Sequence, residues 1–213
     1  MKKYEAVVFD FDGTIIDSQR GIARAFQQAL ATKNIEESIE VIQGLIGPPL
    51  TQTIIDKYGF TEEERDRAMK IHMTYYETEG LYESRIYDGV KEMFQAIKDK
   101  KIPLLIATNK PQDFAEKQLE HYGLAAFVDQ LRGNDRAQKR GTKKMFIKEV
   151  LDEAKVSPEK ALMVGDRDAD LLPAKELGMD TAGVVYGYGS REEIESANPT
   201  YVLETPRELM EYL

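Results

Sequence analysis

Val7-Val8-Phe9-Asp10-Phe11-Asp12-Gly13-Thr14 is the stretch of this sequence that decides the fold. Its apolar, β-prone beginning predicts a buried parallel strand. The strand ends in two carboxylates and a glycine turn, at the sheet edge where open α/β folds place their chemistry. Two like charges about 4 Å apart repel by roughly 4 kcal/mol at an effective dielectric near 20, and a divalent cation or a shared proton removes that cost. Asp-Gly is also common turn chemistry, but here one aspartate can act as nucleophile and the other as acid/base.

The composition is that of a globular protein with room for an insertion. The chain has 213 residues, of which 42% are hydrophobic and 31% charged. A net charge of −9 disfavours nucleic acid and anionic membrane as partners. The absence of cysteine excludes disulfides and zinc-thiolate sites. With no long apolar stretch, we expect a cytoplasmic protein, either a monomer or a homodimer.

The segment 16–84 is predicted to be entirely helical. It is too long for an ordinary crossover between parallel strands, which needs little more than a dozen residues. We therefore predict an inserted helical domain at 16–84, and a core domain formed by 1–15 plus 85–213. The helices expected in the insertion cover residues 20–32, 35–45, 51–58 and 61–82, and Thr61 with Glu64 predicts a capping box at the start of the last one.

Strands and helices alternate through the rest of the chain. This order predicts a doubly wound, Rossmann-like parallel sheet, and hence an α/β fold. The expected strands cover residues 4–9, 102–107, 127–131, 161–164, 181–185 and 201–203, and the expected helices cover 89–100, 112–122, 142–154, 169–177 and 207–212.

Three of the predicted strands end in polar side chains, and parallel strands bring these ends to one edge of the sheet. The first ends in Asp10 and Asp12, the second in Thr108-Asn109-Lys110, and another in the segment 165–170. A basic segment, 139–144, begins a helix between them. Carboxylates, a hydroxyl and a lysine at one edge suit Mg²⁺ and a phosphate, because Mg²⁺ takes a few carboxylates together with waters and phosphate oxygens.

These motifs, present in order, resemble the haloacid dehalogenase-like hydrolases with an inserted helical cap, close to the phosphoglycolate phosphatase branch. The resemblance covers essentially the whole chain. The family's Asp-x-Asp motif is Asp10 and Asp12, its strand-ending Ser or Thr is Thr108, and its acidic Gly-Asp-x-x-x-Asp motif includes Asp166 and Asp170.

The resemblance implies a role for each motif residue. Asp10 attacks phosphorus, and Asp12 first protonates the leaving alcohol and then deprotonates the attacking water. A lysine offsets the charge on nucleophile and phosphate. Relatives often place a proline after this lysine; this chain has none, so we choose Lys143 by its position at the helix start, with Lys144 and Lys139 as alternatives.

The resemblance also implies a metal site and a phosphate site. Mg²⁺ is expected on Asp10, on Asp166 and on the backbone carbonyl of Asp12. Asp170 is expected either to bind the metal through water or to fix the acidic loop. The residues expected at the substrate are Thr108, Asn109, Gly13, Thr14, and, from the cap, Gly47 and Arg20. Gly47 belongs to a stiff turn, 47–50, which resembles the family's substrate-facing loop; its alternative is a plain turn between helices. Arg20 is expected either at a substrate carboxylate or on a helix surface.

The leading hypothesis is a Mg²⁺-dependent phosphatase for small phosphate monoesters resembling phosphoglycolate or nucleoside 5′-monophosphates. The alternatives are a phosphomutase, a phosphonate hydrolase and a non-catalytic metabolite-binding protein. A mutase usually has a histidine soon after the first motif, where this chain has Ser18-Gln19-Arg20-Gly21. A phosphonate hydrolase uses a cap lysine, for which Lys33 and Lys57 are candidates only by residue type. The segment 187–190 lacks the third glycine of a dinucleotide fingerprint, and we expect it to form a loop near the site.

Overall fold

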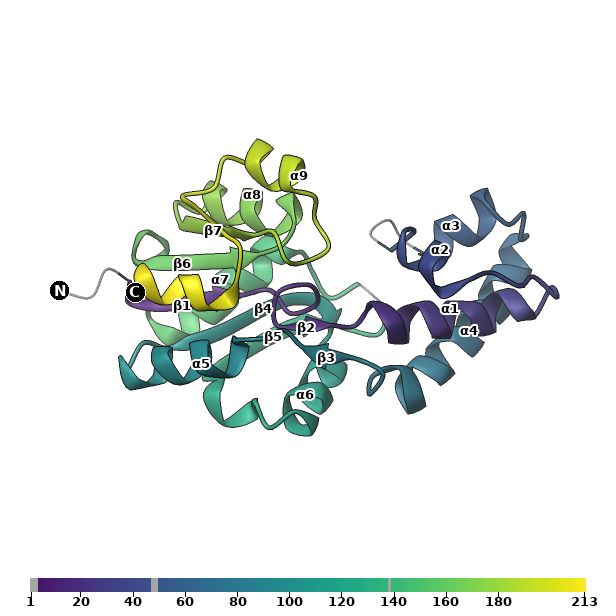
Figure 1. The fold of residues 1–213 in the computed structure, drawn as a ribbon, viewed down its shortest axis with the longest axis horizontal. Coiled ribbons are helices and arrows are strands. Elements are labelled where there is room, and N and C mark those ends of the chain that lie inside the picture. The colour runs from purple at the N-terminus through teal and green to yellow at the C-terminus, as the bar shows by residue number, and fades with distance from the viewer. Residues whose placement is uncertain (1–3, 47–49, 138) are drawn as a thin grey trace. The chain divides into compact units, whose positions relative to one another are not determined.

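The computed structural model describes residues 4–46, 50–137 and 139–213. The chain forms two compact units (Figure 1). Unit 1 comprises Met1–Asp17 and Ile86–Leu213, and unit 2 comprises Ser18–Arg85. Short strands β2 (Ile16–Asp17) and β3 (Arg85–Ile86) pair where the chain leaves and re-enters unit 1.

Unit 1 is built on a parallel sheet with β1 in its interior. The strand order is β5-β4-β1-β6-β7-β8, and the register aligns Val8 of β1 with Leu105 on one side and Met163 on the other. All the pairings in this sheet are parallel, so the predicted α/β, doubly wound fold is confirmed. The strands are β1 (Ala6–Phe9), β4 (Leu104–Pro111), β5 (Gln130–Asn134), β6 (Ala161–Gly165), β7 (Asp180–Val184) and β8 (Tyr201–Leu203).

Side chains of β1 alternate between two hydrophobic cores, one on each face of the sheet. Val7 and Phe9 pack into one core, and Ala6 and Val8 into the other. Because a strand buried on both faces has no solvated side, β1 is apolar throughout. The first core is completed by α5 (Val90–Asp99) and α6 (Gln112–His121), and the second by α7 (Lys143–Ala154) and α8 (Asp168–Glu176).

Unit 2 has a helical core of its own. Its helices are α1 (Gln19–Ala31), α2 (Ile39–Gln43), α3 (Leu50–Asp56) and α4 (Glu62–Tyr75), followed by a π-helical turn, Tyr76–Gly80. Phe26, Ile42 and Ile54 are among the side chains buried between them. The predicted capping box is present: the Thr61 hydroxyl accepts from the Glu64 amide, and the Glu64 carboxylate accepts from the Thr61 amide. Most of the predicted turn at 47–50 lies outside the described residues.

Several predictions of the elements were wrong. Residues Ile16–Asp17, predicted in the helical segment, form β2. Strand β4 continues to Pro111, four residues beyond the predicted end, so that Thr108 and Lys110 are part of the strand rather than of a loop after it. Strand β5 begins at Gln130, because Ala125–Phe127 forms a 3-10 turn where a strand was predicted. Helix α9 (Arg191–Ser196) was not predicted; its N-cap Ser190 accepts a hydrogen bond from the Glu193 amide.

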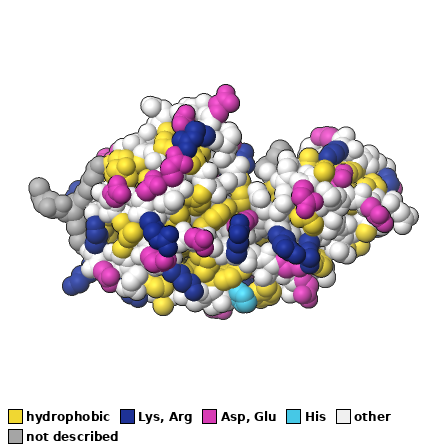
Figure 2. All heavy atoms as spheres, viewed as in Figure 1, with side chains coloured by type: hydrophobic (Ala, Val, Ile, Leu, Met, Phe, Trp, Pro, Cys, Tyr) yellow, Lys and Arg dark blue, Asp and Glu magenta, His cyan; other side chains and the backbone are white. Residues whose placement is uncertain are grey.

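Neither the described helices nor the surface face in Figure 2 has the features of a membrane-spanning or nucleic-acid-binding protein. Over the described residues, no helix is both long and apolar enough to cross a bilayer. On the face in Figure 2, Lys and Arg side chains are interspersed with Asp and Glu side chains. Such mixing is ordinary for a globular surface and offers no extended track for a phosphate backbone on that face.

Candidate active site

A tight turn after β1 presents Asp10 and Asp12. The Asp10 amide donates to the Val164 carbonyl of β6 at 2.9 Å, which continues the sheet pairing beyond the end of β1. The chain then reverses at Gly13, whose φ is +87°. A Cβ at Gly13 would lie 2.2 Å from an Asp166 carboxylate oxygen. Glycine is therefore required there both by the backbone conformation and by the close approach of the carboxylate.

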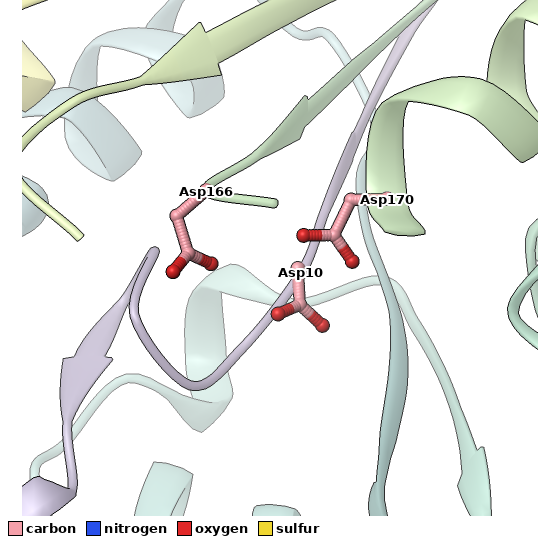
Figure 3. A group of neighbouring side chains, drawn as sticks. All are labelled: Asp10, Asp166 and Asp170. Atoms are coloured by element: carbon pink, nitrogen blue, oxygen red, sulfur yellow. The ribbon is translucent and has the colours of Figure 1, made fainter. Parts of the chain in front are cut away.

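Three buried carboxylates meet at the carboxyl edge of the sheet (Figure 3). We call Asp10, Asp166 and Asp170 the acidic cluster; each offers an oxygen, and these oxygens all lie within 4.8 Å of one another. Asp10 follows β1, Asp166 follows β6, and Asp170 lies in the first turn of α8. The cluster brings together, at one point, residues from two motifs that are far apart in the sequence.

Burial and mutual repulsion make the acidic cluster costly without a cation. Burial, together with the charge of Asp170, raises the pKa of Asp10 to about 7 despite a neighbouring lysine. Burial and the charges of Asp170 and Asp10 also raise the pKa of Asp166 well above its usual value. Converging carboxylate oxygens are the donor set that Mg²⁺ prefers, so these residues fit the metal that the sequence predicted.

Asp166 is held from two sides by the backbone and by small residues. Its carboxylate accepts from the Thr14 hydroxyl at 3.1 Å and from the Tyr188 amide at 2.8 Å. A Cβ on Gly187 would lie 2.3 Å from the Asp166 Cβ, and one on Gly189 would lie 2.0 Å from its carbonyl oxygen. The expectation that residues 187–190 form a loop near the site is therefore confirmed, and its glycines permit the close approach to Asp166.

Lys143 is the lysine that the structure brings to the acidic cluster. Its ammonium contacts Asp10, lies 2.8 Å from Asp170, and donates to the Ala107 carbonyl at 3.1 Å. Burial alone would lower the pKa of Lys143, but the two carboxylates raise it, so the lysine stays charged. The alternatives lie elsewhere: Lys144 pairs with the exposed carboxylate of Glu176, and Lys139 is exposed. Lys143 is 5% exposed, so it is not a solvated surface lysine.

A second buried lysine, Lys110, contacts the other aspartate of the pair. Its ammonium donates to both Asp12 oxygens, at 2.8 and 3.1 Å. The Lys110 side chain is 3% exposed, whereas that of Asp12 is 24% exposed. The sequence predicts Lys110 at the end of a strand but indicates no function for it. The sequence feature that could have indicated a function is the position of Lys110 directly after Thr108 and Asn109, at the sheet edge where the charged residues gather.

The structure locates the remaining predicted residues as follows. Thr108 is buried, and its hydroxyl accepts from the Lys110 amide at 3.1 Å, while Asn109 is exposed at the end of β4. The Asp12 carboxylate is not in the acidic cluster, which leaves its backbone carbonyl for the metal role that was predicted. Arg20 lies exposed on α1 of unit 2. Gly47 lies outside the described residues.

Gly13 and Thr14, predicted at the substrate, lie against Asp166. Thr14 is fully buried, its hydroxyl is bonded to Asp166, and its carbonyl accepts from the Tyr186 hydroxyl at 3.0 Å. Gly13 and Thr14 thus both support Asp166 of the acidic cluster. A direct contact of either residue with substrate stays a prediction.

Comparison with known proteins agrees with this geometry. The family model for haloacid dehalogenase-like hydrolases matches residues 7–184. The chain belongs to this family. A 5′-nucleotidase of Pseudomonas aeruginosa is 35% identical over 200 residues, covering 93% of this chain and 90% of that protein. A phosphoglycolate phosphatase of Vibrio cholerae is 31% identical, covering 99% of this chain and 97% of that protein.

One solved structure is similar to this chain over its whole length. It comes from a Clostridium difficile protein whose naming as a phosphatase is provisional, and it covers 100% of both chains with 36% identity and a TM-score of 0.96. The predicted family, its phosphoglycolate phosphatase-like branch and an enzyme of the phosphatase class are confirmed. The differently named relatives leave the substrate open.

Proposed function

We propose that this protein hydrolyses small phosphate monoesters with Mg²⁺, through an aspartyl phosphate formed on Asp10. The observation that carries the proposal is the position of Asp10. It lies buried at the end of β1, between the Lys143 ammonium and two further carboxylates. A nucleophile needs a fixed position and nearby positive charge that offsets its own charge and that of an incoming phosphate.

In the first step, an Asp10 oxygen attacks phosphorus and the bond from phosphorus to the ester oxygen breaks. Asp12 gives its proton to that departing oxygen, so the product leaves as an alcohol. In the second step, water attacks the aspartyl phosphate, Asp12 takes the proton of the water, and the bond from phosphorus to Asp10 breaks. Two aspartates thus divide nucleophilic and acid/base chemistry between them.

The acidic cluster is proposed to hold Mg²⁺, together with the Asp12 backbone carbonyl. When bound, the ion supplies charge stabilisation to the phosphoryl oxygens. Among the chain's own groups, the Lys143 ammonium offsets negative charge at Asp10, and the Thr108 hydroxyl and Asn109 amide are proposed to bind phosphoryl oxygens. Asp170 accepts from the Arg167 amide at 3.1 Å, which orients its carboxylate at the start of α8.

Specificity is proposed to lie in unit 2, acting as a cap over the core domain. The predicted domain division, 16–84 as cap and the rest as core, is part of this proposal. A cap that closes over bound substrate excludes water and contacts the leaving group. Relatives named for phosphoglycolate and for 5′-nucleotides support small phosphate monoesters as the class. The substrates we propose are therefore phosphoglycolate-like or nucleoside 5′-monophosphate-like.

The test is phosphate release from a panel of monoesters, with Mg²⁺ and with a chelator, beside Asp10→Asn. We expect release with Mg²⁺ only, and none from the variant, because an amide is a poor nucleophile. Asp168→Asn is the matched control, since Asp168 is exposed and lies outside the acidic cluster. Equal release by Asp10→Asn and the unaltered protein, with deamidation excluded by mass spectrometry, would overturn the assignment.

A further inference from the structure

Asp10 and Asp12 each form an ion pair with a different buried lysine. Lys143, from the start of α7, contacts Asp10, and Lys110, from the end of β4, contacts Asp12. The second contact joins residues 98 positions apart in the sequence. Both pairs lie at one edge of the sheet, but they involve different carboxylates and different elements.

The Lys110–Asp12 contact differs from the surface ion pairs of this protein. Its ammonium reaches both carboxylate oxygens, at 2.8 and 3.1 Å, and the lysine side chain is 3% exposed. By contrast, Lys144 and Glu176 form a pair whose side chains are 46% and 64% exposed. Solvated pairs of that kind fix little, whereas a buried ammonium with two contacts restrains the orientation of its partner.

Lys110 itself lies on a rigid support. It belongs to β4, an interior strand of the sheet, and its amide donates to the Thr108 hydroxyl at 3.1 Å. Its carbonyl is approached so closely by Gly133 of β5 that a Cβ there would lie 2.7 Å away. The Lys110 ammonium also lies 5.4 Å from the centre of the Phe11 ring. Asp12, in contrast, belongs to a turn, and 24% of its side chain is open to solvent.

We infer that Lys110 is a positioning residue that orients the Asp12 carboxylate for proton transfer to the departing ester oxygen and from the attacking water. This inference rests on the proposed function. A lysine on the sheet supplies the orientation that the turn after β1 does not supply by itself. Lys143 has the separate role of offsetting charge at the nucleophile, so the two lysines support different groups in the same reaction.

The two lysines should therefore be distinguishable by the leaving group. An alkyl ester such as 2-phosphoglycolate or AMP needs a proton on its departing oxygen, whereas 4-nitrophenyl phosphate and acetyl phosphate release good leaving groups with little help. We expect Lys110→Met to lower kcat/KM for the alkyl esters, which reports the first step, by about 30-fold or more, a part of the roughly 100- to 10,000-fold that acid/base catalysis contributes. For 4-nitrophenyl phosphate or acetyl phosphate we expect kcat/KM to fall by less than about threefold, because their first step needs little proton transfer. The second step, in which Asp12 takes the proton of the water, is common to both classes and does not enter kcat/KM.

Three further variants make the test specific. Lys143→Met should lower turnover of both classes of ester alike, because Lys143 contacts the nucleophile. Lys144→Met is the matched control and should change neither class. Lys110→Arg keeps the positive charge and should restore part of the alkyl-ester activity that Lys110→Met loses.

A double-mutant cycle with Asp12→Asn supplies an independent measurement on the alkyl esters. If Lys110 acts through Asp12, Lys110→Met should cost little more once Asp12 is already an amide. Thermal unfolding of each variant shows whether a loss of activity comes from an unfolded protein. If Lys110→Met is unfolded, the cycle is repeated with Lys110→Arg in its place.

The inference is overturned if Lys110→Met lowers kcat/KM of both ester classes equally, or if its effect on the alkyl esters adds fully to that of Asp12→Asn. A raised KM for every ester and weaker inhibition by inorganic phosphate, with kcat unchanged, would instead make Lys110 a phosphate-binding residue. In each of these outcomes the unaltered protein still hydrolyses esters and the proposed function stands. If the unaltered protein releases phosphate from no ester, the proposed function and this inference fail together.

Discussion

Replacing His72 by glutamine tests how unit 2 responds to pH. His72 lies in α4, is 7% exposed, and packs beside the rings of Phe26 and Tyr76. Its ring donates to the Ala25 carbonyl, and its buried Nδ1 has no hydrogen-bond partner among the residues that the structure describes. Burial lowers the pKa of His72 from 6.5 to about 4, so the folded protein keeps this imidazole neutral.

The sign and size of the effect follow from proton linkage. Between pH 6.5 and 4 the unfolded chain binds more protons at His72 than the folded chain does, so stability falls as the pH falls. The contribution of neutral His72 is fully present above the unfolded pKa and is lost as the pH falls toward the folded one. With these two pKa values, linkage predicts a loss of about 2 kcal/mol between pH 7 and pH 5.

The assay is urea unfolding of the full chain at pH 7 and pH 5, followed by circular dichroism. His72→Gln keeps a donor for Ala25 but does not titrate, so we expect it to remove about 2 kcal/mol of the pH dependence. His121→Gln is the matched control, because the other histidine is exposed. The reasoning is refuted if both variants keep the full pH dependence of the unaltered protein, or if both lose it equally.

Three further predictions concern the acidic cluster and its supports. Mg²⁺ at 100 times its dissociation constant should raise the free energy of unfolding by about 2.7 kcal/mol in urea titrations, and Asp170→Asn should remove most of this gain. Gly13→Ala should lower the free energy of unfolding by about 1–3 kcal/mol, because φ is +87° and the new Cβ would collide with Asp166. Lys143→Met should lower kcat by about 100-fold or more, since it removes the ammonium beside Asp10, and steady-state phosphate release measures it.

Each of these predictions has a control that the chain provides. Asp168→Asn should keep the stabilisation by Mg²⁺, and an equal loss in both variants would place the ion elsewhere. Gly123→Ala shares a positive φ, +68°, but has open space around its Cβ, so a cost equal to that of Gly13→Ala would rule out the collision. Lys144→Met should leave kcat unchanged; a matching fall would contradict the assignment of Lys143.

The residues with the clearest local pattern were the ones that the sequence predicted best. The apolar run before Asp10 identified the interior strand, because a strand buried on both faces has little choice of residue. The Asp10, Asp12 and Asp166 positions followed from carboxylates placed directly after such strands. The alternation of strands and helices then predicted the doubly wound sheet without any tertiary information.

The residues that depend on tertiary contact were harder to predict. The position of Lys143 at the helix start favoured it without excluding Lys144 and Lys139, and the packing of α7 against the sheet selects Lys143. The contact of Lys110 with Asp12 arises from the parallel pairing of β4 with β1, which no spacing in the sequence encodes. The end of β4 was also predicted wrongly, because Thr108 and Lys110 are buried in a strand although they are polar.

The interior position of β1 also has a consequence for how the chain folds during synthesis. β1 completes its pairing only with β4 and β6, whose residues follow it by roughly a hundred or more positions. Unit 2 is one continuous segment, Ser18–Arg85, with its own core, so its contacts are available much earlier. A nascent chain whose residues Ala161–Gly165 have not yet left the ribosome therefore has an incomplete sheet, and it also lacks Asp166 and Asp170, which follow β6. The order of emergence makes the helical unit the early folding product and the catalytic centre the late one.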